Sequence, residues 1–412
     1  MKFRKRKNIF VLSIAILALL FCLFFIAIKW LRPLLNLSEA AAKPAYTVKT
    51  EEPVLTQIYF TNENAKVDSS QLIIDEINRA QKTIEIAMYS FKSNDIRDAL
   101  YKASERGVKV TLILDYRKKT ENNIFLLNMP TNIKRIDVGT DNGAGGTSLM
   151  HHKFALIDRG EEKGKLIFGS FNWTQLQKDY DRSFFLLSAN RELIKSFGRE
   201  FDRLAGGEFS TTKLANKNYS AWDLNLKAAN YNYNVWFSPG RQNGNIDREI
   251  LNLISAAKKD IKIMVWDFTD KSLANEIIYR AKAGLKITII ADSLNFYNKY
   301  SVFNYLLSEK ERLNLNNLEI LSNDVSLQKN GQASTTIDGI VADESIDPFL
   351  HYHLIIIDQK KILFGTNNWS KGGSFFNDES AIETDDPKII NPFNESFDYN
   401  YSQGKIASST NK

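Results

Sequence analysis

All four histidines of this 412-residue chain lie in two short segments. His151-His152-Lys153 is followed after four residues by Asp158, and then by Gly169-Ser170-Phe171-Asn172. His351-Tyr352-His353 is followed after four residues by Asp358, and then by Gly365-Thr366-Asn367-Asn368. Alternate residues of a strand share a face, so His151 should lie beside Lys153 and His351 beside His353. An imidazole next to a second nitrogen group suits an anionic substrate, and two imidazoles can divide nucleophilic attack and proton transfer between them.

The doubled pattern resembles the H-x-K-x4-D and G-[ST]-x-N signature of the phospholipase D superfamily, and the resemblance extends over both halves of the chain beyond its N-terminal region. It implies a phosphodiesterase that works without a metal or other cofactor, through a covalent phosphohistidine. By motif position, His151 would be the nucleophile, and His351 would be the general acid and then the general base.

The same resemblance implies roles for the neighbouring polar residues. Contacts to the phosphoryl oxygens would come from Lys153, Ser170, Asn172, Thr366 and Asn368. Asp181 and Glu379 occupy positions where the family often has a carboxylate that orients a histidine, with Asp179 and Asp378 as the respective alternatives. Asp158 and Asp358 complete the two catalytic motifs, and we expect them to brace the motif strands rather than to react.

The second motif departs from the family pattern at one position. His353 stands where the family has lysine, so a permanent positive charge is replaced by a group that is charged only below about pH 6.5 unless its surroundings shift its pKa. Our hypothesis from the sequence is that a protonated His353 substitutes for the lysine, which would favour mildly acidic conditions.

Two alternatives concern the same histidines. His351 and His353 on one strand face would suit half of a zinc site, but no cysteine and no further histidine or carboxylate cluster completes the ligand set in the sequence, so no metal is expected. The replacement at His353 also favours a scaffold that has kept the fold without activity, although His151, Lys153 and both asparagines are retained. His152 is expected to be a buried core residue.

An internal repeat indicates how these segments are positioned. Residues 84–91 and 107–111 match residues 261–268 and 284–288 at an offset of 177, whereas the histidine motifs are offset by 200. Apolar runs alternate with helical patterns in both copies, which is typical of α/β units. The predicted fold is therefore two tandem phospholipase D-like α/β units, with mixed sheets packed around a pseudo-twofold axis.

The boundaries follow from the repeat and from the flanking composition. We expect a first unit at residues 55–205, a linker at 206–232, a second unit at 233–400 and a polar tail at 401–412.

The N-terminal region predicts a membrane anchor. Residues 9–28 contain no charged residue and are long enough to cross a bilayer as a helix. We expect a basic cytoplasmic tail at 1–7, a transmembrane signal-anchor helix at 8–30 and a linker at 31–54, with the remainder outside the inner membrane of a bacterium. The alternative is a cleaved signal peptide, for which Ala40-Ala41-Ala42 offers small residues.

Charge distribution bears on the substrate. Residues 1–43 hold eight Lys/Arg and one Glu, which leaves 46 basic and 47 acidic residues in the remainder. A nucleic-acid-binding surface is normally basic, and this remainder is not basic overall. A phospholipid headgroup diester beside the membrane is therefore the favoured substrate. DNA or RNA is the alternative, since the Gly-Ser-Phe-Asn-Trp-Thr segment resembles the nuclease and cardiolipin-hydrolase branch; a cardiolipin synthase is disfavoured, because the sequence predicts one membrane span. No obligate protein partner is inferred.

Overall fold

The computed structural model describes residues 49–50, 56–63, 68–118, 129–139, 148–228, 230–241, 245–296, 298–323 and 349–406. The predicted tail 1–7 and membrane helix 8–30 lie outside these residues, as do most of the linker 31–54 and the end of the tail 401–412. Among the described helices, none is both long enough and apolar enough to span a membrane. Residues 46–412 group into one compact unit.

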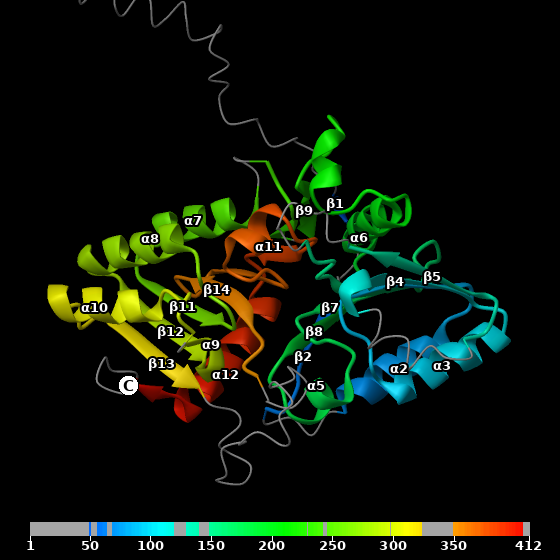
Figure 1. Ribbon diagram of the computed structural model, residues 1–412, viewed down its shortest axis with the longest axis horizontal. Helices are drawn as coiled ribbons and strands as arrows, with labels where there is room; N and C mark the ends of the chain where they lie inside the picture. The colour runs from blue at the N-terminus through cyan, green and yellow to red at the C-terminus, as the bar shows by residue number, and fades with distance from the viewer. Residues whose placement is uncertain are drawn as a thin grey trace, which may run out of the picture. The chain divides into compact units, whose positions relative to one another are not determined.

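The first half of this unit forms a seven-stranded mixed sheet in the order β2-β8-β7-β6-β3-β4-β5 (Figure 1). Strands β3, β4 and β5 are parallel, and the other neighbours are antiparallel. Its elements are β2 (Thr56–Phe60), α2 (Ser69–Arg79), β3 (Thr83–Met88), α3 (Asn94–Glu105), β4 (Lys109–Asp115), η1 (Tyr116–Lys118), β5 (Ile133–Val138), β6 (Lys153–Ile157), β7 (Lys165–Gly169), α5 (Gln175–Asp179), β8 (Phe184–Ser188) and α6 (Arg191–Ala205).

The second half repeats this order and adds strands at both edges, giving β1-β9-β10-β16-β15-β14-β11-β12-β13-β17. Its elements are β10 (Tyr231–Phe237), α7 (Ile246–Ala256), β11 (Asp260–Val265), α8 (Lys271–Lys282), β12 (Lys286–Asp292), α9 (Ser293–Phe296), α10 (Phe303–Leu313), β13 (Leu318–Asn323), β14 (His353–Ile357), β15 (Lys361–Gly365), α11 (Lys371–Phe375), β16 (Ser380–Thr384) and α12 (Pro387–Gln403). The added strands are β1 (Lys49–Thr50), β9 (Trp222–Ala228) and β17 (Lys405–Ile406).

The segment that joins the halves has structure of its own. Residues 206–232, expected to be a linker, contain the 3₁₀ helix η2 (Ser210–Ala215) and strand β9, which pairs with β10. Helix α12 continues beyond residue 400, and β17 follows it. These segments therefore contribute elements to the second sheet and its surroundings.

Local sequence explains where the helices begin. The side chains of Asp68, Asn190, Asp270 and Asp386 each accept a backbone N–H of the first helical turn, which stabilises the ends of α2, α6, α8 and α12. The apolar faces of the same helices are buried, as Ile73 and Ile77 of α2 illustrate. The capping residues and the spacing of apolar residues thus indicate the same starting points for these helices.

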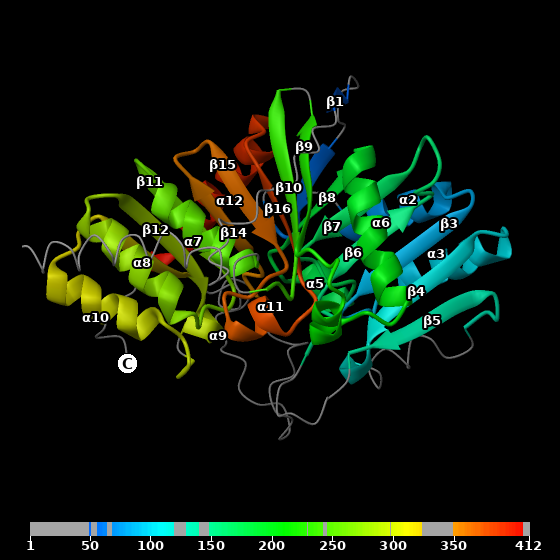
Figure 2. The same ribbon diagram turned by 90° about the horizontal axis from the view of Figure 1, so that it is seen from above.

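Three apolar clusters hold the layers together, and the predicted α/β class with two mixed sheets is confirmed. One cluster joins α2 and α3 to the outer face of the first sheet, and another joins α7, α8 and α10 to the second (Figure 2). The largest cluster contains residues of both sheets together with α6 and α12. Within it, Phe168 of β7 and Phe364 of β15 lie 6.3 Å apart, so the two sheets share an inner core.

Candidate active site

The two leading histidines are anchored by backbone contacts that cross between the halves. The N–H of His151, just before β6, donates to the carbonyl of Asp378 at 2.9 Å, and the N–H of His351, just before β14, donates to the carbonyl of Arg182 at 2.8 Å. Both histidines are almost completely buried. Each half therefore fixes the position of the other half's histidine.

Glu379 of the second half contacts the His151 ring. Its Oε2 lies 2.8 Å from His151 Nδ1 and accepts a hydrogen bond from the Thr366 hydroxyl at 2.6 Å. Its Oε1 accepts from Asn377 Nδ2 at 3.1 Å. A carboxylate in this position fixes the Nδ1–H tautomer and leaves the other ring nitrogen free to attack.

His351 meets an amide instead of a carboxylate. Gln177 of α5 places its Nε2 3.3 Å from His351 Nδ1. Asp181, expected to orient a histidine, instead accepts a hydrogen bond from the N–H of Phe349 and lies against the Gln177 side chain. The residue that contacts the His351 ring is therefore Gln177, which the motif pattern did not single out, and no sequence signal marked it.

The groups beside the two histidines differ in charge. Lys153 Nζ is buried and donates to the carbonyl of His151 at 3.0 Å, and it lies 5.4 Å from the centroid of the Tyr89 ring. His353 is also buried, its ring 5.3 Å from that of His351, and neither of its ring nitrogens has a hydrogen-bond partner among the described residues. The fixed cation of the first motif thus has a neutral counterpart in the second.

Burial dominates the electrostatics of the site. It lowers the pKa of His151, His351 and His353 well below the usual value, and the neighbouring charges of Lys153 and the other imidazoles lower these pKa values further. Backbone carbonyls of Thr366 and Ser170 act on the rings of His151 and His351 in the opposite direction. Burial and these charges oppose protonation of His353 in the free site, and the hypothesis that its protonated form substitutes for the lysine stays a prediction.

Burial also raises the pKa of the Glu379 carboxyl group to about 8, although Lys153 and the hydrogen bonds from Thr366 and Asn377 act to lower it. The charges of Lys153 and His151 also act on His351, so these groups of the two halves lie within reach of one another. An anionic substrate would favour the protonated imidazoles that this site disfavours when it is free.

The residues expected to bind phosphate fall into two kinds. Asn172 and Asn368 have buried side-chain oxygens without a hydrogen-bond partner among the described residues, so both are available to a ligand's donor or to reorientation of the amide. The hydroxyl of Ser170 accepts the N–H of Phe184, and that of Thr366 is engaged by Glu379 and the N–H of Ser380. In the free protein, these two hydroxyls therefore form hydrogen bonds with protein groups around the site.

Asp158 and Asp358 lie at the opposite ends of β6 and β14 from the histidines. The Asp158 carboxylate accepts three backbone N–H groups, those of residues 81 to 83 at the start of β3, at 2.7–2.8 Å. Asp358 accepts those of residues 258 to 260 at the start of β11 in the same manner. Both carboxylates therefore hold the motif strands in register and lie outside the catalytic cluster.

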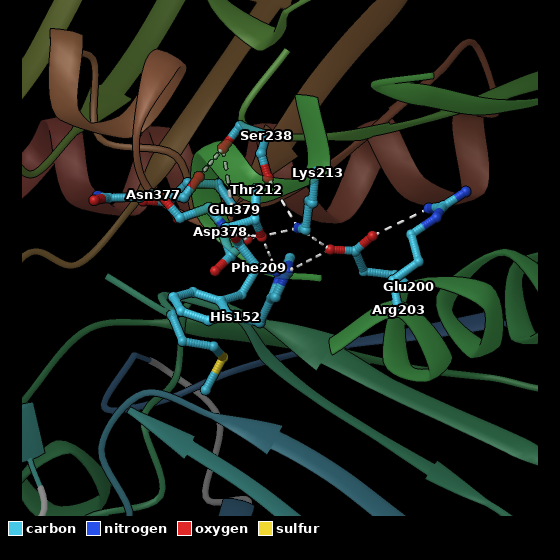
Figure 3. A network of polar contacts seen from close by, with 12 residues as sticks. His152, Glu200, Arg203, Phe209, Thr212, Lys213, Ser238, Asn377, Asp378 and Glu379 are labelled. Atoms are coloured by element: carbon cyan, nitrogen blue, oxygen red, sulfur yellow. Dashed lines mark hydrogen bonds and ion pairs between the residues drawn. The ribbon is translucent and has the colours of Figure 1, made fainter. Parts of the chain in front are cut away.

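A buried ionic network lies beside Glu379 and connects to its backbone N–H through Ser238 (Figure 3). The Lys213 ammonium forms ion pairs with Glu200 and, at 2.6 Å, with Asp378, and it donates to the carbonyl of Ser238. The Ser238 hydroxyl in turn accepts the N–H of Glu379 at 3.1 Å. His152, expected to be a core residue, is fully buried with Nε2 3.1 Å from Glu200.

The charges of this network stabilise one another. Burial acts to raise the pKa of Glu200, but Lys213 and His152 bring it below its usual range. Burial acts to lower the pKa of Lys213, but Asp378 and Glu200 raise it above its usual range. His152, Glu200 and Asp378 also form a group with metal-like spacing in the described part of the chain, and the Lys213 ammonium supplies positive charge to its two carboxylates. The pair His351 and His353 is not part of that group.

Aromatic rings flank both histidines. Tyr89 lies edge-on to His151 with 4.8 Å between ring centroids, and Trp266 lies edge-on to His351 at 5.4 Å. These two aromatic residues occupy the same position in the two copies of the repeat, 177 residues apart. The internal repeat pairs these two residues. The alternation of apolar and polar residues along their strands, however, did not predict that their rings lie beside the histidines.

Comparison with known proteins agrees with the motifs and the fold. Residues 73–205 and 250–401 match the family model described as "Cardiolipin synthase, PLD-like domain", which covers more than half of the chain. The chain belongs to the phospholipase D superfamily.

Curated relatives of this superfamily member match about a third of its chain. Mitochondrial cardiolipin hydrolase of Mus musculus is 33% identical over 138 residues, which cover 33% of this chain and 57% of the relative. Phospholipase D of Rickettsia felis is 33% identical over 128 residues, covering 31% of this chain and 60% of the relative. The chain thus spans less than two thirds of the length of these relatives.

Solved structures share the fold over most of the chain. Phosphatidylserine synthase of Haemophilus influenzae Rd KW20 superposes with a TM-score of 0.62 at 14% identity, over 85% of this chain and 87% of that chain. Polyphosphate kinase from Porphyromonas gingivalis superposes with a TM-score of 0.55 at 14% identity, over 84% of this chain and 50% of that chain. At this level of identity the likeness concerns the fold alone.

Proposed function

We propose that this protein is a phosphodiesterase that hydrolyses a phospholipid headgroup diester through a phosphohistidine intermediate. The observation that carries the proposal is the convergence of His151 and His351, one from each half, in a single buried site with Lys153 and Glu379. Such a cluster contains a nucleophile, a proton donor and a cation for the non-bridging oxygens.

The first step transfers the phosphoryl group to the protein. The unprotonated nitrogen of His151 attacks phosphorus and forms a P–N bond while the P–O bond to the leaving alcohol breaks. Protonated His351 donates its proton to the departing oxygen. Glu379, at Nδ1 of His151, stabilises the positive charge that the phosphohistidine acquires.

The second step releases the product. His351, now neutral, takes a proton from water, whose oxygen attacks phosphorus. The P–N bond breaks, its electron pair returns to His151, and a phosphomonoester leaves. Lys153, Asn172 and Asn368 would hold the phosphoryl oxygens in both steps, since cationic and amide donors favour the charge that develops there.

The membrane location expected from the sequence would favour a lipid substrate. The uncharged run at residues 9–28 would anchor the chain in the inner membrane of a bacterium, with the catalytic unit on the extracytoplasmic side. The names of the curated relatives, cardiolipin hydrolase and phospholipase D, fit a phospholipid substrate. Fractionation of cells, combined with protease accessibility of the unit from outside, tests this location.

A second candidate is a nuclease that acts on DNA or RNA. The segment Gly169-Ser170-Phe171-Asn172-Trp173-Thr174 favours it, because it resembles the branch of the superfamily that includes nucleases. The nearly neutral balance of charge beyond residue 43 argues against it, because non-specific nucleic-acid binding relies on basic surfaces.

The test offers labelled phospholipid vesicles, single- and double-stranded DNA, and RNA to the purified full-length chain in the presence of EDTA, with His151→Ala as control. Release of a labelled headgroup by the wild type alone supports the proposal. Cleavage of nucleic acid alone selects the nuclease. Absence of turnover on every substrate, with an intact fold, would favour the inactive scaffold.

A further inference from the structure

The two histidines differ in the group that faces Nδ1, and the internal repeat shows where the difference arises. Glu379 directly precedes β16, and its N–H donates to the Ser238 hydroxyl. Ser183 directly precedes β8, and its N–H donates to the Thr61 hydroxyl at 2.8 Å. Since Thr61 and Ser238 are equivalent in the repeat, Ser183 occupies the place of Glu379. The first half therefore has no carboxylate at the position that would serve His351.

Gln177 contacts Nδ1 of His351 through an amide group, where Glu379 contacts His151 through a carboxyl group. The side chain comes from α5 and is largely buried, with its Oε1 accepting the N–H of Asn172 at 2.5 Å. Only the amide oxygen can accept that hydrogen bond, so the NH₂ group must be the end that faces His351 Nδ1 at 3.3 Å. An N–H donor at this nitrogen opposes its protonation, whereas a carboxylate favours it.

The other groups around His351 do not cancel this difference. Burial, Lys153 and His151 disfavour positive charge on the ring, and the Ser170 carbonyl favours it. The rings of Trp266 and His353 lie edge-on to it. Asp181 lies behind Gln177, and burial raises the pKa of its carboxyl group well above the usual value, as does nearby Asp292. The Asp181 carboxyl group is engaged by the N–H of Phe349 and by the Gln177 side chain, so it acts on the His351 ring only through that amide.

We propose that Gln177 is a positioning residue that makes His351 the weaker base of the two histidines, and hence the proton donor, while Glu379 makes His151 the nucleophile. This assignment rests on the proposed function. It follows from the contacts of this chain, independently of the order of its motifs. A weakly basic ring gives up its proton readily to a leaving oxygen, and a ring backed by a carboxylate stabilises the cationic phosphohistidine.

The test follows the four histidines of the full-length chain by nitrogen NMR after selective ¹⁵N-histidine labelling. In the wild type, His351 should carry its proton on Nε2 with Nδ1 unprotonated. Gln177→Glu keeps an acceptor for the Asn172 N–H and places a carboxylate at His351, so the pKa of His351 should rise by about 1–3 pH units. Gln177→Leu supplies the bulk without the charge, and Gln57→Glu is a matched change at an exposed position; neither should reproduce this rise.

Activity supplies the second readout. Quenched reactions of the wild type should trap phosphate on His151, and the exchanged variant Gln177→Glu with Glu379→Gln should shift trapped phosphate toward His351. An Nδ1-protonated His351 in the wild type, or an unchanged His351 pKa in Gln177→Glu, would overturn the inference. Failure of the proposed function looks different: no diester is cleaved and no phosphate is trapped, while the NMR titrations still decide what Gln177 does to His351.

Discussion

At the scale of single residues, the ionisation of Glu379 determines how well His151 can act as a nucleophile. Burial raises the pKa of Glu379 to about 8, against the lowering influence of Lys153 and of its hydrogen-bond donors. Below that pH the carboxyl group of the free protein is protonated and stabilises a cationic His151 poorly. Above that pH, the carboxylate accepts a hydrogen bond from Nδ1–H of His151 and favours nucleophilic attack by Nε2.

The resulting prediction concerns the pH dependence of kcat/KM, which reports groups in the free protein. The reaction also needs a protonated His351, whose pKa in the free protein lies well below the usual value. Between the two pKa values the active form carries as many protons as the dominant form, so kcat/KM should stay level there and fall as the pH increases through about 8. Glu379→Gln should remove this limb and lower kcat roughly a hundredfold or more, as expected for loss of a group that supports acid-base chemistry. A profile measured from pH 5 to pH 10 checks this; the same limb near pH 8 in the variant would assign it to another group.

His353 and Ser183 occupy the positions of an interacting pair in the other half. In the repeat, residues 353 and 183 correspond to Lys153 and Glu379, which interact electrostatically. His353→Lys alone would bury a cation without a carboxylate, and we expect it to lower the free energy of unfolding by roughly 3 kcal/mol.

Adding Ser183→Glu should restore the pair, with a coupling energy of at least about 1 kcal/mol in a double-mutant cycle. Denaturant unfolding of the wild type, both single variants and the double variant measures that coupling. Additive effects would show that the two positions are independent.

At the scale of elements, the ends of strands β7 and β15 position the two Gly-Ser/Thr-x-Asn segments. Gly169 ends β7 where a Cβ atom would lie 2.1 Å from the carbonyl oxygen of Phe184, and Gly365 ends β15 in the same way against Ser380. Backbone groups cannot move aside as a flexible side chain can. These glycines therefore set the close approach that brings the Gly-Ser/Thr-x-Asn segments to the histidines.

Gly169→Ala should accordingly destabilise the fold by about 1–3 kcal/mol, because the new methyl group meets fixed backbone. Gly160→Ala is the matched control, since a Cβ atom there meets nothing within 4 Å. Thermal unfolding of both variants makes the comparison. Equal stability of the two would mean that β7 and β8 separate without cost.

The elements also show what a sequence can predict. Periodicity and the repeat predict the strands around His151 and His351, because buried runs such as residues 354–357 leave few alternatives. The contact between Glu379 and His151 needs the other half of the chain, and Gln177 is recognisable only once α5 is folded. Hydrogen bonds between residues more than 170 apart in sequence leave no local pattern.

At the scale of the whole molecule, the halves are joined by buried charge as well as by apolar packing. Lys213, from the segment between the halves, connects Glu200 of the first half with Asp378 of the second. Removal of one partner leaves the others charged in a dry interior, which costs far more than the pair contributes.

Lys213→Met should therefore lower the free energy of unfolding by about 3–5 kcal/mol. The added change Glu200→Gln should recover part of the loss, because one of the two uncompensated carboxylates is then neutral. Chemical denaturation of both variants measures this. A single variant as stable as the wild type would mean that Glu200 and Asp378 take up protons without cost.

Covalent joining of the halves has an evolutionary consequence. In a dimer of identical subunits, every substitution appears twice, so a histidine at the position of Lys153 would remove both lysines and a serine at the position of Glu379 would remove both carboxylates. Within one chain, His353 and Ser183 can occupy one copy of each position while Lys153 and Glu379 occupy the other. Gene duplication followed by fusion thus permits the two halves to specialise.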